Sequence, residues 1–254
     1  MKPAVILVGS DKGGVGKTTV SRALLDFLAR KSIPARAFDT ENPRGSLHRF
    51  YPTISEIIDL SNVADQMKIL DTLETAKVNV TVVDLKAGSL LGALDTFERI
   101  GVLKAARDGQ FDLGLMHIIG PSVASLDEIA EVAPYVEGLH YMLVRNFINE
   151  TNFFEWDEAT YNKYFANLKR SGEIEVPKLN EMAYEQVDLA GVTFNNFIAN
   201  KAANHEDADF SFVLRGYVRK WTAEIEAEFK QLELLKSLMQ DGGQSSPVQA
   251  AAAD

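Results

Sequence analysis

Residues 10–19 combine the glycines and polar side chains that bind phosphate in proteins. They read Ser-Asp-Lys-Gly-Gly-Val-Gly-Lys-Thr-Thr and lie between an apolar run at 4–8 and an amphipathic stretch at 17–31. Glycines let the backbone turn its N–H groups inward, and the N-terminus of a following helix adds partial positive charge. Lys17 can reach the β- and γ-phosphates, and Thr18 can offer its hydroxyl to magnesium. The segment predicts a site for ATP and Mg²⁺.

Acidic residues follow two further apolar runs. The run 34–38 ends at Asp39, with Glu41 close behind, and the run 78–83 ends at Asp84. The carboxyl ends of parallel strands meet at one edge of a sheet, so these carboxylates are expected beside the phosphate-binding loop. Carboxylates bind Mg²⁺ or its waters and can orient an attacking water. Two alternatives stay open: Asp39 and Glu41 can merely cap a turn, and Asp84 can be structural.

The second lysine of the loop, Lys12, indicates which class of phosphate-binding loop this is. The run from Lys12 to Thr18, Lys-Gly-Gly-Val-Gly-Lys-Thr, resembles the deviant Walker A loop of the ParA/MinD ATPase superfamily. The resemblance implies that Lys12 reaches across a homodimer interface to the partner's nucleotide, with ATP sandwiched between the subunits. Asp11 departs from the family pattern, in which glycine precedes this lysine. We expect an aspartate to be tolerated there if its φ is negative.

The same resemblance assigns roles to the residues after the strands. Glu41 is expected to orient the attacking water, and Asp39 to lie near Mg²⁺, directly or through a water. Asp84 is expected to hold a Mg²⁺-bound water, and Gly88 to approach the γ-phosphate. The candidate catalytic residues are Lys12, Lys17, Asp39 and Glu41, and the candidate metal residues are Thr18, Asp39 and Asp84.

The resemblance also implies that residues farther along the chain, Asn146 and the backbone at Pro177, contact the adenine base. Asn146 follows the run 140–144, and an amide can donate and accept hydrogen bonds at the adenine edge. The backbone at Pro177 is a second expected base contact; for Asn146, a plain turn residue is the alternative. The expected nucleotide contacts are Asp11, Lys12, Gly13, Gly14, Val15, Gly16, Lys17, Thr18, Thr19, Gly88, Asn146 and Pro177.

Apolar runs alternate with helical patterns along the chain. This alternation predicts a single-domain α/β P-loop NTPase with a mostly parallel twisted sheet and helices on both faces. The expected strands are 4–8, 34–38, 78–83, 113–119, 140–144 and 173–177. The expected helices are 17–31, a stretch closed by 70–76, 125–135, 153–168 and most of 180–239. The ATPase domain is expected to span 1–240, followed by a disordered polar tail at 241–254.

Composition excludes several classes of protein. The chain has 254 residues, a formal net charge of −10 and no cysteine. Disulfides, thiolate zinc sites and iron–sulfur clusters are therefore excluded, and the absence of cysteine fits a reducing cytosol. The resemblance to ParA/MinD ATPases implies a bacterial cytoplasmic protein, with nucleoid association left open. No apolar run reaches the roughly 18 residues that a membrane span needs, so no membrane insertion is expected. The apolar side of 228–239 is expected to pack on the domain rather than on lipid.

The family resemblance also implies partners. Partition ATPases of the ParA kind bind DNA without sequence preference, through phosphate contacts, and respond to an activating adaptor protein. Arg215, Arg219 and Lys220 form the best basic cluster for such contacts, although a solvated helix face is an alternative. Lys163, Lys169 and Arg170 form a second, weaker cluster.

The leading hypothesis is a dimerising molecular switch of the ParA type. It would hydrolyse ATP slowly to ADP and act in plasmid or chromosome partition, conjugation-linked DNA maintenance or cargo positioning. One alternative is a metabolic P-loop ligase of the dethiobiotin or cobyrinate synthetase type. Another is a module that binds ATP without hydrolysing it.

Overall fold

A single sheet of seven parallel strands forms the centre of the molecule. The computed structural model describes residues 2–73, 75, 77–148, 152–155, 157–163 and 172–242. The order across the sheet is β3 (Ser55–Ile57), β2 (Ala35–Asp39), β4 (Val80–Asp84), β1 (Ala4–Gly9), β5 (Asp112–Ile119), β6 (His140–Asn146) and β7 (Gly172–Val176). Every residue of β1 and β4 is buried, because helices cover both faces of the sheet.

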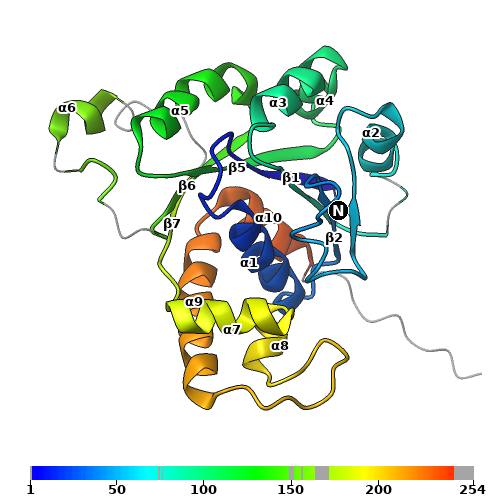
Figure 1. The fold of residues 1–254 in the computed structure, drawn as a ribbon. Helices are drawn as coiled ribbons and strands as arrows, with labels where there is room; N and C mark the ends of the chain where they lie inside the picture. The colour runs from blue at the N-terminus through cyan, green and yellow to red at the C-terminus, as the bar shows by residue number, and fades with distance from the viewer. Residues whose placement is uncertain are drawn as a thin grey trace, which may run out of the picture.

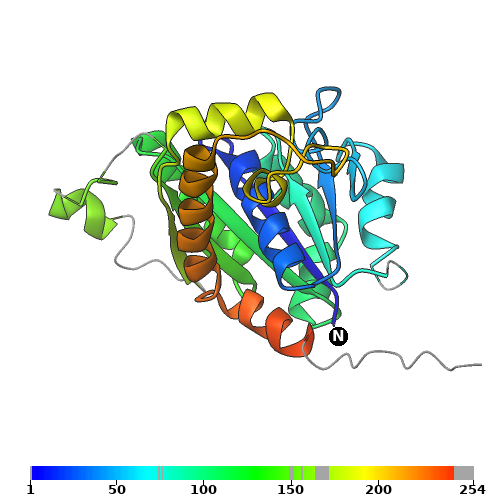
Figure 2. The ribbon, with the colours of Figure 1, turned by 90° about the horizontal axis from the view of Figure 1, so that it is seen from below.

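The helices form two layers, one on each face of the sheet (Figure 1). One layer contains α1 (Lys17–Arg30), α7 (Glu181–Ala190), α8 (Phe194–Ile198), α9 (Phe212–Phe229) and α10 (Glu233–Gly242). The other contains α2 (Val63–Leu70), α3 (Leu90–Arg99), α4 (Val102–Arg107), α5 (Val123–Val136) and the short α6 (Glu158–Tyr161). Seen from below, the first layer lies in front of the sheet (Figure 2).

The side chains of β1 point alternately into two apolar clusters, one on each face of the sheet. Ile6 and Val8 pack into the cluster formed with α1 and α7–α10, whereas Val5 and Leu7 pack into the cluster formed with α3, α4 and α5. Successive side chains of a strand point to opposite faces, so each half of the core receives every second residue. The layered α/β fold predicted from the sequence is confirmed, and all six strand pairings are parallel.

Two predicted helices are wrong in extent. The stretch 70–76 was expected to close a helix, but α2 ends at Leu70 and 71–73 form a turn. The expected helix 153–168 is replaced at its start by a turn, because Phe153 and Phe154 have φ values of 44° and 61°. The side chain of Phe153 is fully buried, so its apolar character reflects the core and not a helix face. Of that range, 156 and 164–168 lie outside the described residues.

The last helices cover the sheet and do not extend from it. Phe229, Leu232 and Leu235 are buried in the core, which confirms that the apolar side of this region packs on the domain. Helix α10 runs to Gly242, two residues into the predicted tail; the rest of that tail, 243–254, lies outside the described residues. Within the described part of the chain, none of the helices is both long and apolar enough to cross a bilayer.

Candidate nucleotide-binding site

The phosphate-binding loop leaves the carboxyl end of the central strand β1 and enters α1. Gly14 and Gly16 take left-handed conformations with φ of 75° and 89°, which glycine adopts at no steric cost. A Cβ at Gly16 would lie 2.3 Å from the amide nitrogen of Asn146. That nitrogen donates to the carbonyl of Val15 at 2.8 Å. The expected adenine reader Asn146 therefore also fixes the loop, and residue 16 has to be glycine.

The two lysines of the loop point to different places. The ammonium of Lys17 is buried and donates to the carbonyl of Lys12 at 2.7 Å. Burial lowers the pKa of Lys17, against the opposing effect of Asp84 and other nearby carboxylates. The ammonium of Lys12 is exposed and donates to the hydroxyl of Ser122 at 2.6 Å. Lys17 therefore lines the phosphate cavity, whereas the amine of Lys12 lies against the start of α5.

Oxygen ligands suited to Mg²⁺ meet where β4 ends. One carboxylate oxygen of Asp84 accepts from the hydroxyl of Thr18, and the other from the hydroxyl of Ser21, both at 2.8 Å. Burial raises the pKa of Asp84 to about 7, against the lowering effect of the hydrogen bonds from Thr18 and Ser21 and of the Lys17 ammonium. Among the described residues no group of three or more His, Asp or Glu side chains could hold a metal. Mg²⁺ needs only one or two protein oxygens beside phosphate and water, so Thr18 and Asp84 fit it.

The loop after β2 is organised around Asp39. Its buried carboxylate accepts backbone N–H bonds from Glu41 at 2.9 Å, Leu47 at 2.6 Å and His48 at 3.0 Å. These bonds favour a loop-holding role, and the metal-proximal role of Asp39 stays a prediction. The side chain of Glu41 accepts from the hydroxyl of Ser46 and lines the cavity beside Asp39. The water-orienting role of Glu41 stays a prediction.

These residues enclose a cavity of about 320 Å³ at the carboxyl edge of the sheet. Its lining residues are Gly13, Gly14, Gly16, Lys17, Thr18, Thr19, Asp39, Glu41, Asp84, Leu85, Lys86, Ala87, Ile148 and Tyr184. Gly88, expected near the γ-phosphate, is not on this wall; its N–H donates to the carbonyl of Asp11 at 2.8 Å. The cavity brings together predicted residues from three separate parts of the chain. The other expected contacts do not line it: Asp11, Lys12, Val15, Gly88, Asn146 and Pro177.

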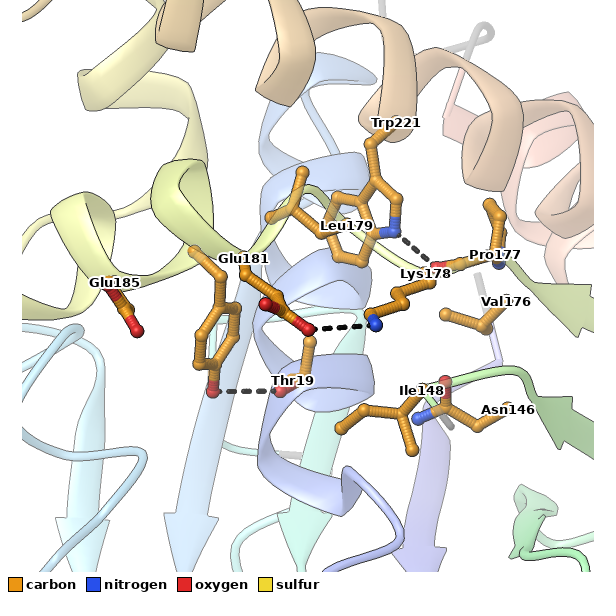
Figure 3. Close-up of a pocket in the computed structure, with 11 residues that line it drawn as sticks. Thr19, Asn146, Ile148, Val176, Pro177, Lys178, Leu179, Glu181, Glu185 and Trp221 are labelled. Carbon is orange, nitrogen blue, oxygen red and sulfur yellow. Dashed lines mark hydrogen bonds and ion pairs between the residues drawn. The ribbon is translucent and has the colours of Figure 1, made fainter. Parts of the chain in front are cut away.

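A second, more apolar cavity of about 190 Å³ shares Thr19, Ile148 and Tyr184 with the first (Figure 3). Its wall includes Asn146 and Pro177, the two expected base contacts. The carbonyl of Pro177 already accepts from the indole N–H of Trp221 at 2.7 Å, so this backbone is held firmly in the wall. An apolar cavity with a few polar groups beside the phosphate site suits a nucleoside base.

Asp11 adopts a backbone conformation that needs no glycine. It is not among the non-glycine residues with positive φ, so the condition set for tolerating aspartate there is met. Its N–H donates to Glu128 on α5 at 2.7 Å. Glu128 also accepts from Ser10 at 3.3 Å and lies 3.1 Å from Nε2 of the buried His117. Burial acts to raise the pKa of Glu128, but the hydrogen bonds from His117, Asp11 and Ser10 outweigh it and hold the pKa below its ordinary value.

The sequence did not predict that Glu128, with His117 bonded to it, holds the phosphate-binding loop through hydrogen bonds. Glu128 lies three residues after Ser125 and four before Val132, both buried, so a glutamate on the apolar face of α5 was the signal available. His117, within the apolar strand β5, was a second such signal. Buried polar groups need partners: His117 has Tyr141 and Glu128, and Glu128 has Ser10 and Asp11 of the phosphate-binding loop.

The predicted basic cluster is only partly exposed. Arg219 and Lys220 are exposed on α9, and Lys220 pairs with Glu224 at 3.7 Å. Arg215 is half-buried and donates to the carbonyl of Ile198 at 3.5 Å, so it does not share an open face with Arg219. In the second cluster Lys163 is exposed, whereas Lys169 and Arg170 lie outside the described residues.

The parallel sheet and its glycine-rich loop at the central strand define an α/β fold of the P-loop ATPase kind. The chain is similar in structure to a ParA family ATPase from Chlorobium tepidum, with a TM-score of 0.51 and 15% identity over 88% of this chain and 99% of that one. It is similar to the septum site-determining protein MinD of Pyrococcus horikoshii, complexed with Mg-ADP, with a TM-score of 0.51 and 16% identity over 90% and 100%. Neither a protein-family model nor a curated protein sequence matches the chain. The chain therefore shares the fold of ParA and MinD ATPases.

Proposed function

We propose that the chain is a dimerising ATP switch of the ParA/MinD type. ATP and Mg²⁺ occupy the phosphate cavity, with the base in the adjoining apolar cavity. Lys17 contacts the phosphates, Thr18 and Asp84 hold Mg²⁺ or its waters, and Glu41 orients the attacking water. Mg²⁺ neutralises charge on the phosphate oxygens when bound.

One observation supports the dimer above all others. Lys12 belongs to the phosphate-binding loop, yet it is not among the residues that line the cavity, and its amine is exposed on Ser122. A lysine placed there can reach the nucleotide of a second copy more readily than its own. Dimerisation controlled by ATP then makes the protein a switch for positioning or segregating DNA or another cargo. An adaptor protein is the expected activator of its slow hydrolysis.

The test measures molar mass by light scattering without nucleotide, with ADP and with ATP, in each case with Mg²⁺. We expect ATP alone to produce a dimer, and Lys12→Ala to abolish that dimer while keeping nucleotide binding. Lys104→Ala is the matched control, because Lys104 is an exposed lysine on α4 that pairs with Asp108. An undiminished ATP dimer in Lys12→Ala would remove the basis of the proposal.

A module that binds ATP without turnover is the second candidate. The observation that favours it is that Asp39 already accepts three backbone N–H bonds, which leaves Glu41 as the only acid proposed to act on water. Phosphate release measured with DNA and cell extract, for the wild type and Glu41→Gln, separates the two. Turnover that Glu41→Gln abolishes supports the switch, and no turnover in the wild type supports the module.

A further inference from the structure

Asp11 joins the phosphate-binding loop to a distant helix. One of its carboxylate oxygens accepts the backbone N–H of Leu90 at 2.6 Å, and the other accepts that of Leu91 at 3.4 Å. These are the first two residues of α3, whose leading N–H groups have no partner within the helix. A carboxylate at this end also complements the partial positive charge of the helix N-terminus.

Helix α3 does not supply this cap itself. The residue before it, Ser89, makes no side-chain bond to the helix, and its hydroxyl donates to the carbonyl of Lys86 instead. The cap comes from Asp11, 79 positions earlier in the chain. A glycine at position 11, as in the ParA/MinD pattern, has no side chain with which to make these bonds.

The backbone of Asp11 holds the turn that leads into the same helix. Its carbonyl accepts the N–H of Gly88, which has a φ of 73°. Its own N–H is fixed by Glu128 on α5. Any movement of the loop when phosphates bind therefore acts on Gly88 and on the start of α3 through one residue.

We propose that Asp11 is a positioning residue that couples the nucleotide state of the phosphate-binding loop to helix α3. The coupling rests on nucleotide binding at this loop, which is part of the proposed function. It makes α3 the element whose stability and position report whether ATP is bound. Asp11 acts through hydrogen bonds to the helix and needs no contact with the nucleotide.

Hydrogen exchange of the full chain tests the coupling, with Mg²⁺ and either ADP, a slowly hydrolysed ATP analogue or no nucleotide. In the wild type we expect exchange in peptides covering 88–97 to change with nucleotide, together with peptides covering 10–20. In Asp11→Ala and Asp11→Gly, the 10–20 peptides should still respond and the 88–97 peptides should lose most of their response, since only the backbone bond from Gly88 to residue 11 remains. Loss of a helix cap of about 1 kcal/mol corresponds to about fivefold faster exchange at the first turn of α3.

Two further variants separate coupling from general damage. Asp11→Asn can still accept the N–H of Leu90 and should restore most of the response, because asparagine caps helices about as well as aspartate. Ser89→Ala removes the hydroxyl next to α3 that makes no cap, and it should keep the full response. The proposal is overturned if the 88–97 peptides of Asp11→Ala respond to nucleotide as strongly as those of the wild type. It is also overturned if Ser89→Ala loses this response as fully as Asp11→Ala does.

The same hydrogen-exchange measurements are repeated with the Asp11 variants combined with Lys12→Ala. Because Lys12→Ala is expected to prevent dimerisation, contacts between copies then cannot change the exchange of α3. If the wild type never dimerises with ATP, the proposed switch is wrong, while the response of the 88–97 peptides still decides the role of Asp11. If the wild type dimerises and α3 responds equally with and without the Asp11 carboxylate, the switch stands and the coupling is wrong.

Discussion

The ammonium of Lys12 lies 2.6 Å from the hydroxyl of Ser122, at the N-terminus of helix α5. Ser122 also accepts the N–H of Ser125 at 3.3 Å and so caps that helix. Without a partner subunit, the lysine proposed to act on the other copy's nucleotide is therefore held on its own chain. If Lys12 acts across the proposed dimer interface, dimer formation has to break this contact.

Ser122→Ala should strengthen the ATP-dependent dimer by about five- to 150-fold, because two hydrogen bonds, one in each subunit and each worth about 0.5–1.5 kcal/mol net, no longer oppose it. The dissociation constant of the dimer, measured by sedimentation with an ATP analogue, checks this. Ser211→Ala is the control, since it also removes a serine cap, that of α9, far from Lys12. Equal effects of the two substitutions would mean that Ser122 acts only on stability.

Asp84→Asn should weaken the Mg²⁺-dependent part of nucleotide affinity by about 10–100-fold, the usual effect of losing a group that supports a metal site. Burial holds the pKa of Asp84 at about 7, so in the wild type protons compete with Mg²⁺ and affinity should fall as pH drops below 7. In Asp84→Asn this pH dependence should be absent. Titration of a fluorescent nucleotide with Mg²⁺ or with a chelator, between pH 6 and pH 8, measures both effects. A steep pH dependence retained by Asp84→Asn would assign it to another group.

Asp26→Asn should change how stability depends on pH. Asp26 is buried in α1, and burial raises its pKa from 3.8 to about 6, although the N–H of Asn195 donates to it at 3.0 Å. The folded state thus binds this proton more tightly than the unfolded state. The stabilisation that results is complete below about pH 4 and is lost as the pH rises through 6.

The free energy of unfolding of the wild type, minus that of Asp26→Asn, should accordingly fall by about 2–3 kcal/mol between pH 4 and pH 7.5. Urea unfolding of the nucleotide-free proteins gives this difference. Asp95→Asn, at an exposed carboxylate of α3, should show no comparable trend. A difference independent of pH would mean that Asp26 is already neutral at pH 7.5 or is not desolvated.

Joint replacement of Arg219 and Lys220 by alanine should weaken DNA binding if α9 carries the DNA surface. Each side chain that no longer neutralises a phosphate reduces the slope of log affinity against log salt by about 0.9, so the slope of the double variant should be smaller by about 1.8. Binding of a labelled duplex at several salt concentrations, with ATP and Mg²⁺, measures the slope. Arg215→Ala is expected to act on stability instead, because its guanidinium faces the carbonyl of Ile198. An unchanged slope in the double variant would place any DNA contact elsewhere.

The sequence predicted the parts of the site that local chemistry determines. Gly16, Lys17 and Thr18 are contiguous, and Asp84 ends a buried apolar strand, so their meeting at one sheet edge follows from the parallel fold. The partners of Asp11 and Lys12 on α3 and α5 could not be predicted, since hydrogen bonds across about 80 to 120 positions leave no local pattern. The three-residue edge strand β3 is too short for periodicity, and helices α3 and α4 are separated only by Ile100 and a left-handed Gly101.

The indole of Trp221 gives the apolar cavity an optical property. The chain has two tryptophans, and Trp221 is 3% exposed, lines this cavity and donates to Pro177. A purine that enters the cavity changes the polarity and stacking around this indole. Nucleotide occupancy should therefore be measurable from the protein's own fluorescence, with Trp156→Phe used to remove the second emitter.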